Sequence, residues 1–143
     1  MPLPDIPGLV VGRSARKGNT GMINIVVVDD EALIRRAYTD IFEDMGYSVT
    51  AFENGMALLE AFPRLSPDLI ILDVQMPGLD GISVCREIRK TPGGMKTPII
   101  IISGSCGRSE PDLIYSGANR FINKPVDTDD LIDAVTRTLQ EVS

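Results

Sequence analysis

The chain has 143 residues, of which 43% are hydrophobic and 24% charged, and this composition is typical of one soluble globular domain. Its formal net charge of −6 argues against a nucleic-acid-binding surface, and no apolar run is long enough to span a bilayer. The sequence contains no histidine, which excludes histidine-based catalysis, histidine metal ligands and a role as a phosphohistidine donor.

The two cysteines, Cys85 and Cys106, lie too far apart in the sequence to indicate a metal-binding or redox pair. We interpret them as reduced thiols of an intracellular protein and expect a cytoplasmic location. Cys85 falls on the inward side of a predicted helix, which favours a small core residue over a reactive thiol.

Residues 1–21 differ from the rest of the chain, because they begin with a proline-rich stretch and continue as a polar, basic one. This pattern predicts a flexible tail, and it lacks the long apolar segment of a secretory signal. Met22 stands directly before the first predicted strand. The tail is therefore a leader left by expression, a mis-assigned start or a native extension, and the folded domain is expected over residues 22–143.

Residues 23–28 form a β-branched apolar run, which predicts a buried strand that ends at Asp29 and Asp30. A helix follows and Gly46 is placed to end it. The predicted apolar stripe of this helix comprises Ile34, Ala37, Tyr38, Ile41, Phe42 and Met45. Residues 47–52 alternate in polarity and predict the next strand.

Asn54 is suited to cap a short helix that ends at Pro63. Residues 69–72 are uninterrupted apolar residues, too few for a helix core, and they predict a strand buried on both faces. This strand ends in Asp73, and a loop and a helix over 81–89 follow. A carboxylate at the exit of a buried strand suits chemistry better than packing, because ligands of open α/β sheets bind beyond the carboxyl ends of the strands.

Residues 98–102 predict another buried strand, which ends at Ser103. A helix is expected over 107–116, but Pro111 falls inside it. Since proline is easily accommodated only in the first turn of a helix, this fourth helix should be short or displaced.

The last predicted strand covers residues 119–123 and ends at Lys124, and a final helix begins near Asp127 or Thr128. Strands and helices thus alternate five times along the chain. This alternation predicts an α/β fold, a doubly wound, flavodoxin-like five-stranded parallel sheet with helices on both faces and a short or irregular fourth helix.

Polar side chains follow the ends of four predicted strands: Asp29 and Asp30, then Asp73, Ser103 and Lys124. All should meet at the carboxyl edge of one sheet, where three carboxylates repel one another unless a cation lies among them. Oxygen ligands without histidine or cysteine select a hard ion such as Mg²⁺. A lysine and a hydroxyl beside that ion suit a phosphoryl group, which a carboxylate can accept as an aspartyl-phosphate.

Each of these residues also has an ordinary explanation. Asp29 and Asp30 fit a solvated turn or a helix cap, and Ser103 fits a cap. Lys124 fits a surface lysine, and Asp73 could simply hydrogen-bond the loop that it opens. Their joint placement at one sheet edge is the observation that favours a phosphoryl site.

Four motifs carry a resemblance to a known family, and the resemblance covers the chain from residue 22 to the C-terminus. They are Val-Val-Asp-Asp-Glu at 27–31, Leu-Asp-Val-Gln-Met-Pro-Gly-Leu-Asp-Gly at 72–81, Ile-Ser-Gly at 102–104 and Phe-Ile-Asn-Lys-Pro at 121–125. In order and spacing they resemble the receiver domains of two-component response regulators.

The resemblance implies that Asp73 is the phosphoacceptor and that Lys124 contacts the phosphoryl oxygens. It implies that Mg²⁺ is bound by Asp73, by Asp30 directly, by Asp29 through water and by the backbone carbonyl of Gln75. Together these residues would form the catalytic and metal-binding set.

The resemblance also implies a switch, in which Ser103 moves to bond the phosphoryl group and the aromatic ring of Phe121 turns inward. Phe121 fits a plain core residue equally well. Gln75 and Ser105 occupy the two positions that tune the hydrolysis rate in this family.

The implied phosphodonor is a phosphohistidine on a sensor histidine kinase or on a histidine phosphotransfer protein, which agrees with the absence of histidine here. The sequence identifies no downstream effector, and we expect no nucleic-acid or membrane binding by this domain. It leaves open whether the domain forms a homodimer and whether it is a stand-alone regulator.

We classify the chain as a signalling switch and not as an enzyme. One alternative is a receiver-shaped docking module that works without phosphorylation. Another is a Mg²⁺-dependent phosphohydrolase with an aspartyl nucleophile. The best-known class of such enzymes needs a second acid two residues after the nucleophile, and here Gln75 occupies that position. A flavin-binding flavodoxin is disfavoured because the first loop presents acids where a phosphate must bind.

Overall fold

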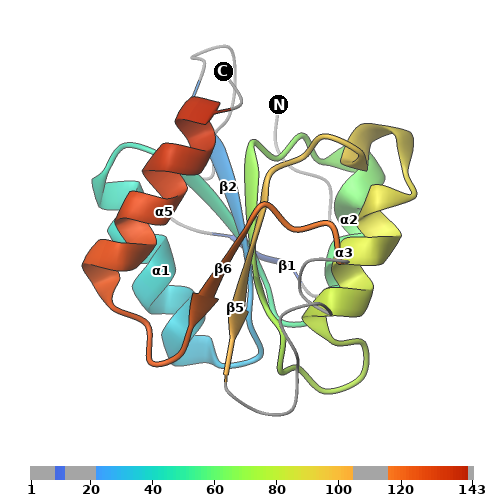
Figure 1. Ribbon diagram of the computed structural model, residues 1–143, viewed down its shortest axis with the longest axis horizontal. Coiled ribbons are helices and arrows are strands. Elements are labelled where there is room, and N and C mark those ends of the chain that lie inside the picture. Colours follow the sequence, from blue (N-terminus) through green and yellow to red (C-terminus); the bar gives the residue numbers. More distant parts are fainter. Residues whose placement is uncertain (1–8, 12–21, 105–115, 142–143) are drawn as a thin grey trace.

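Five parallel strands and one antiparallel strand form a single sheet in the order β1-β3-β2-β4-β5-β6. The computed structural model describes residues 9–11, 22–104 and 116–141 (Figure 1). The strands are β1 (Leu9–Val11), β2 (Asn24–Val28), β3 (Ser48–Phe52), β4 (Leu69–Asp73), β5 (Ile99–Ser103) and β6 (Arg120–Asn123). The described helices are α1 (Ala32–Asp44), α2 (Gly55–Ala61), α3 (Gly81–Arg89) and α5 (Thr128–Glu141), with 3₁₀ turns η1 (Phe62–Arg64) and η2 (Pro92–Gly94).

The sheet separates two hydrophobic cores. Helices α1 and α5 cover one face and α2 and α3 cover the other, as Figure 1 shows. Successive side chains of a strand point to opposite faces, so Val26 and Val28 pack toward α2 and α3 while Ile25 and Val27 pack toward α1 and α5. A strand covered on both faces must be apolar throughout, which explains the unbroken runs in the sequence. The predicted doubly wound fold is confirmed.

The register of the strands brings the predicted site residues to the same level. Val28 lies opposite Leu72 across β2 and β4, so the residues that follow them, Asp29 and Asp73, are neighbours at one sheet edge. On the other side of β4, Ser103 at the end of β5 lies opposite Asn123 of β6. Lys124 follows immediately and donates its backbone N–H to the Ser103 carbonyl at 2.8 Å.

The predicted helices form, with corrections at their ends. In α1, Tyr38 and Phe42 are buried as predicted, but Ala37 and Met45 are exposed. Met45 lies after the last helical residue, and Ala37 falls at the margin of the stripe, which comprises Ile34, Tyr38, Ile41 and Phe42. None of the described helices is long and apolar enough to cross a membrane.

Two side-chain caps start the helices on the other face. Asn54 accepts a hydrogen bond from the Ala57 N–H at 2.8 Å, which confirms the predicted cap of α2. Asp80 caps α3 in the same way through the Ser83 N–H at 2.8 Å. Cys85 of α3 is fully buried, as predicted, and burial raises the pKa of its thiol, so it acts as a core residue.

One strand was not predicted. Residues 9–11 lie within the segment expected to be a flexible tail, yet they form β1 and pair antiparallel with the outer edge of β3. Three consecutive apolar residues, without an alternating pattern, are too short to predict a strand when its partner strand is not known. The fourth helix predicted over 107–116 falls on residues 105–115 for most of its length and so lies outside the described part of the chain.

A single arginine closes the edge of the sheet opposite the acids. The Arg89 guanidinium donates to the carbonyl oxygens of Gly94 at 2.6 Å, Thr97 at 2.7 Å and Gly117 at 3.0 Å, and to Asn119 Oδ1 at 3.1 Å. These acceptors lie just before β5 and β6. Arg89 therefore fixes the starting ends of the two strands whose final residues reach the site.

The close approach of α3 to β4 generates a stability prediction. A Cβ atom on Gly81 would lie 2.4 Å from the Asp73 carbonyl oxygen, whereas a Cβ atom on Gly93 would meet nothing within 4 Å. We expect Gly81→Ala to lower the free energy of unfolding by about 1–3 kcal/mol through overpacking. The control Gly93→Ala should change it by less than about 0.5 kcal/mol. Urea unfolding measures both, and equal effects would contradict this packing.

Candidate functional site

Asp73 is the centre of the carboxyl edge of the sheet. Its side chain is only 2% exposed, and Oδ1 lies 3.0 Å from Lys124 Nζ. The same oxygen accepts the backbone N–H of Gln75 at 3.2 Å. A buried carboxylate is costly unless it is paired, so the lysine and the amide together keep this side chain in place and pointing out of the strand end.

A second group of acids lies beside Asp73. Oxygen atoms of Asp29, Asp30 and Glu31 come within 4.8 Å of one another, with Asp29 buried and the other two exposed. Asp29 Oδ1 accepts the Glu31 N–H at 2.8 Å. Its backbone is held by Arg35, which donates to the Asp29 carbonyl at 2.8 Å, and by Phe52, which accepts the Asp29 N–H at 3.2 Å.

The charges of these acids act on one another. Burial raises the pKa of Asp29 from the ordinary value of 3.8 to about 6, the hydrogen bond from Glu31 opposes that rise, and the charge of Asp73 adds to it. Burial alone would lower the pKa of Lys124. The hydrogen bond to Asp73 and the charges of Asp73, Asp29 and Glu31 outweigh it and raise the pKa. The edge thus carries more negative charge than Lys124 neutralises.

The donor atoms at this edge fit a magnesium ion. They are carboxylate oxygens, with Asp29 and Asp73 close enough to repel each other, and a hard cation between them would relieve that repulsion. Asp29 and Asp30 belong to the acidic cluster and Asp73 lies next to Asp29 across β2 and β4, so these side chains are suited to hold it. Such an ion would neutralise part of the negative charge at this edge.

Ser103 lies at this edge, and its side chain bonds to the backbone of the next residue. Its hydroxyl is buried and donates to the carbonyl oxygen of its neighbour Gly104 at 2.9 Å. Gln75 is exposed, and its side chain lies over Gly104. A Cβ atom on Gly104 would be 3.0 Å from Gln75 Oε1. Ser105 lies outside the described residues.

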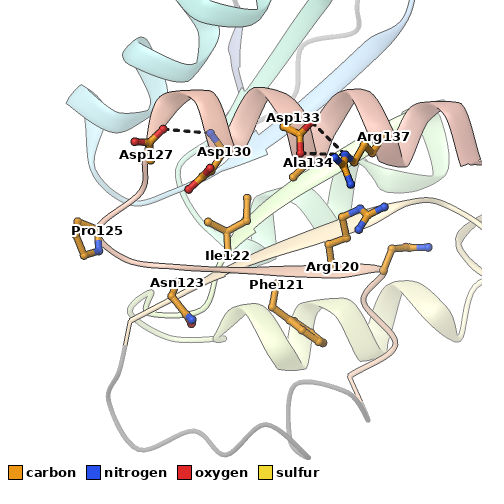
Figure 2. Close-up of a pocket in the computed structure, with 11 residues that line it drawn as sticks. Arg120, Phe121, Ile122, Asn123, Pro125, Asp127, Asp130, Asp133, Ala134 and Arg137 are labelled. Atoms are coloured by element: carbon orange, nitrogen blue, oxygen red, sulfur yellow. Dashed lines mark hydrogen bonds and ion pairs between the residues drawn. The ribbon is translucent and has the colours of Figure 1, made fainter.

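Phe121 lies on the opposite face of β6 from its neighbours. Figure 2 shows Arg120 and Ile122 pointing toward α5 while Phe121 points away from it, beside a groove of about 600 Å³. The ring is half-buried and packs against the core under α2 and α3. This position is compatible with both roles considered for Phe121, a core residue and a mobile aromatic ring.

Sequence reasoning missed Tyr38 as a neighbour of the site, because its position in an apolar stripe indicated only a core residue. Tyr38 lines a cavity of about 270 Å³ together with Asp29, Glu31 and Lys124. Burial and the charges of Asp29 and Asp73 raise its pKa to about 12, so the hydroxyl stays protonated. The signal was its spacing of one helical turn from Ile34, which places both on the ridge facing the acids.

Comparisons with known proteins agree with this geometry. Residues 25–136 match the model of the response regulator receiver domain. The chain belongs to the response regulator receiver family. It is 36% identical over 118 residues to the chemotaxis protein CheY of Bacillus subtilis, a match that covers 80% of this chain and 96% of CheY. This receiver domain is therefore a signalling domain of the two-component type.

Other relatives are longer than this receiver domain. The transcriptional regulatory protein CseB of Streptomyces avermitilis is 35% identical over 118 residues, covering 82% of this chain and 49% of CseB. The chain thus spans about half the length of that regulator. Receiver domains occur both in such transcriptional regulators and in proteins of CheY size.

Solved structures share the fold. A response regulator from Chloroflexus aurantiacus gives a TM-score of 0.77 at 26% identity, covering 83% of this chain and 98% of that one. The receiver domain of the sensor histidine kinase PA1611 from Pseudomonas aeruginosa, solved with magnesium coordinated in its active-site cleft, gives a TM-score of 0.75 at 26% identity. That match covers 83% of this chain and 98% of the other.

The raised pKa of Asp29 generates a pH prediction for the metal-free protein. Above pH 3.8 the unfolded chain releases this proton readily while the folded protein retains it until about pH 6, so folding stability falls as the pH rises through that window. Asp29→Asn keeps an oxygen for the Glu31 amide and removes this loss. Its stability relative to wild type should therefore grow by about 1–2 kcal/mol between pH 4 and 6.5, because a tenfold change in proton affinity corresponds to about 1.4 kcal/mol and partial solvation reduces the full value.

Urea unfolding in the presence of a chelator at several pH values measures this difference between the two proteins. A stability difference that stays constant or shrinks with rising pH would contradict the proposed environment of Asp29.

Proposed function

We propose that this receiver domain accepts a phosphoryl group on Asp73 from a phosphohistidine of a partner protein and thereby switches a signalling output. The observation that carries the proposal is the buried Asp73 carboxylate paired at 3.0 Å with Lys124, beside the acids Asp29 and Asp30. A receiver domain with its acceptor, its cation and its metal-binding acids at one edge has the parts that phosphoryl transfer needs.

In this proposal an oxygen of Asp73 attacks the phosphorus atom as the bond from phosphorus to the donor nitrogen breaks. The imidazole leaves with the bonding electron pair and takes up a proton. Lys124 stays in place and pairs with a phosphoryl oxygen. Its positive charge, which balances the Asp73 carboxylate before the transfer, then balances the phosphoryl group. Mg²⁺ held by Asp29, Asp30 and Asp73, and by the Gln75 carbonyl, would neutralise the remaining oxygens.

The switch follows from the charge that the phosphoryl group brings, which is close to two negative charges and three acceptor oxygens. The Ser103 hydroxyl now donates to the Gly104 carbonyl, and a phosphoryl oxygen would be a stronger acceptor. Movement of Ser103 would pull on the end of β5 and on Lys124, whose N–H is bonded to the Ser103 carbonyl. Phe121 on the adjacent strand would then turn inward.

We infer that a sensor histidine kinase or a histidine phosphotransfer protein in the cytoplasm is the phosphodonor. Self-phosphorylation and hydrolysis, tuned by Gln75 and Ser105, would be the domain's only chemistry, so we do not class it as an enzyme. A docking module that is never phosphorylated would gain nothing from two acids, Asp29 and Asp73, placed close enough to repel each other.

Intact mass after incubation with a small-molecule phosphodonor and Mg²⁺ tests the proposal. We expect one added phosphoryl group on wild type and none on Asp73→Asn or after metal removal. The matched control is Asp68→Asn, which changes an acid at the opposite end of β4, where its side chain accepts the Asn24 N–H. This control should still be phosphorylated.

Failure of folded wild type to gain the mass, together with failure to bind beryllofluoride, would make the domain a docking module. A phosphoryl group that persists on Asp73→Asn would move the acceptor to another residue.

A further inference from the structure

The N-terminal strand β1 lies outside the part of the chain that matches the receiver family, which begins at residue 25. Its three residues pair antiparallel with the last three residues of β3, with Leu9 opposite Phe52, Val10 opposite Ala51 and Val11 opposite Thr50. The pairing thus covers the half of β3 that is nearest to the acids.

The backbone of β3 alternates between its two neighbours. Ser48 donates to the Ile23 carbonyl at 2.9 Å and Phe52 accepts from Asp29 at 3.2 Å, so these even-numbered residues direct their backbone groups toward β2. Val49 and Ala51 must then direct theirs toward the outer edge. Val10, opposite Ala51, is the residue of β1 that can pair with the backbone groups of Ala51.

The end of β3 in turn holds a metal-binding acid. The carbonyl group of Phe52 accepts the N–H of Asp29, and Asp29 Oδ1 accepts the N–H of Glu31. A strand that fixes Ala51 and Phe52 therefore also limits the movement of the acidic loop. Ligands of a metal bind more tightly when groups behind them hold them in position.

We propose that residues 9–11 form an accessory edge strand that holds the end of β3, and through Phe52 the backbone of Asp29, in position to bind a divalent cation. This inference rests on the proposed Mg²⁺ site. The strand is supplied by the same chain: twelve residues separate Val11 from Asn24, and their reach of about 40 Å far exceeds the spacing of about 10 Å across two strands.

Amide hydrogen exchange on the full chain, with Val10→Pro, tests the pairing. Proline at this position removes the N–H that faces Ala51, so we expect the Ala51 amide to exchange at least about tenfold faster than in wild type. Val10→Ile keeps a β-branched residue and should leave the rate unchanged. The Val49 amide faces the same edge outside the β1 register and the Ile71 amide lies in central β4, so both should exchange alike in all three proteins.

Magnesium titration followed by the amide signal of Asp30 tests the link to the site. We expect Val10→Pro to weaken the affinity about threefold and Val10→Ile to leave it unchanged.

An Ala51 exchange rate that is equal in all three proteins would overturn the strand, and protection that depends on protein concentration would assign the pairing to a second copy instead. Faster Ala51 exchange with unchanged affinity would overturn the link to Asp29. Absence of Mg²⁺ binding in wild type would contradict the proposed function and, with it, this link, while leaving the exchange result intact.

Discussion

The ion pair between Asp73 and Lys124 is the interaction on which the rest of the site depends. A carboxylate that is 2% exposed must be paired, and Lys124 is the cation that the structure places beside it. The neighbouring charge of Asp29 works against this arrangement and is seen in the raised pKa of that acid. An edge with this excess of negative charge is suited to bind a metal cation. In the proposed function a phosphoryl group then contacts both that cation and Lys124.

The sheet is held differently at its two ends. At one edge Arg89 bonds the segments that lead into β5 and β6 through three carbonyl groups and the Asn119 side chain. At the other edge Lys124 donates its backbone N–H to the Ser103 carbonyl, and the Ser103 hydroxyl donates to the carbonyl of its neighbour Gly104. The backbone bond between Ser103 and Lys124 links the end of β5 to the end of β6 and can pass a change at Asp73 to β6.

Much of the fold and of the candidate site was predictable because each buried parallel strand leaves a continuous apolar run in the sequence. The residues that end these runs must lie at the same edge of the sheet. Asp73 and Asp29 were found in this way, and their register confirms that they are neighbours. The direction of the Ser103 side chain was not predictable, since nothing in the sequence says that its hydroxyl donates to the Gly104 carbonyl. Strand β1 was missed because its pairing with β3 depends on a partner far along the chain.

The most direct test of the account is a crystal structure with Mg²⁺ and beryllofluoride, which imitates a phosphoryl group. We predict beryllium bonded to an Asp73 oxygen, Mg²⁺ among Asp29, Asp30 and Asp73, and Lys124 on a fluorine atom. Ser103 should have left the Gly104 carbonyl for another fluorine. Beryllofluoride bound while Ser103 stays on Gly104 and Lys124 turns to solvent would contradict the central claim that these two residues read the state of Asp73.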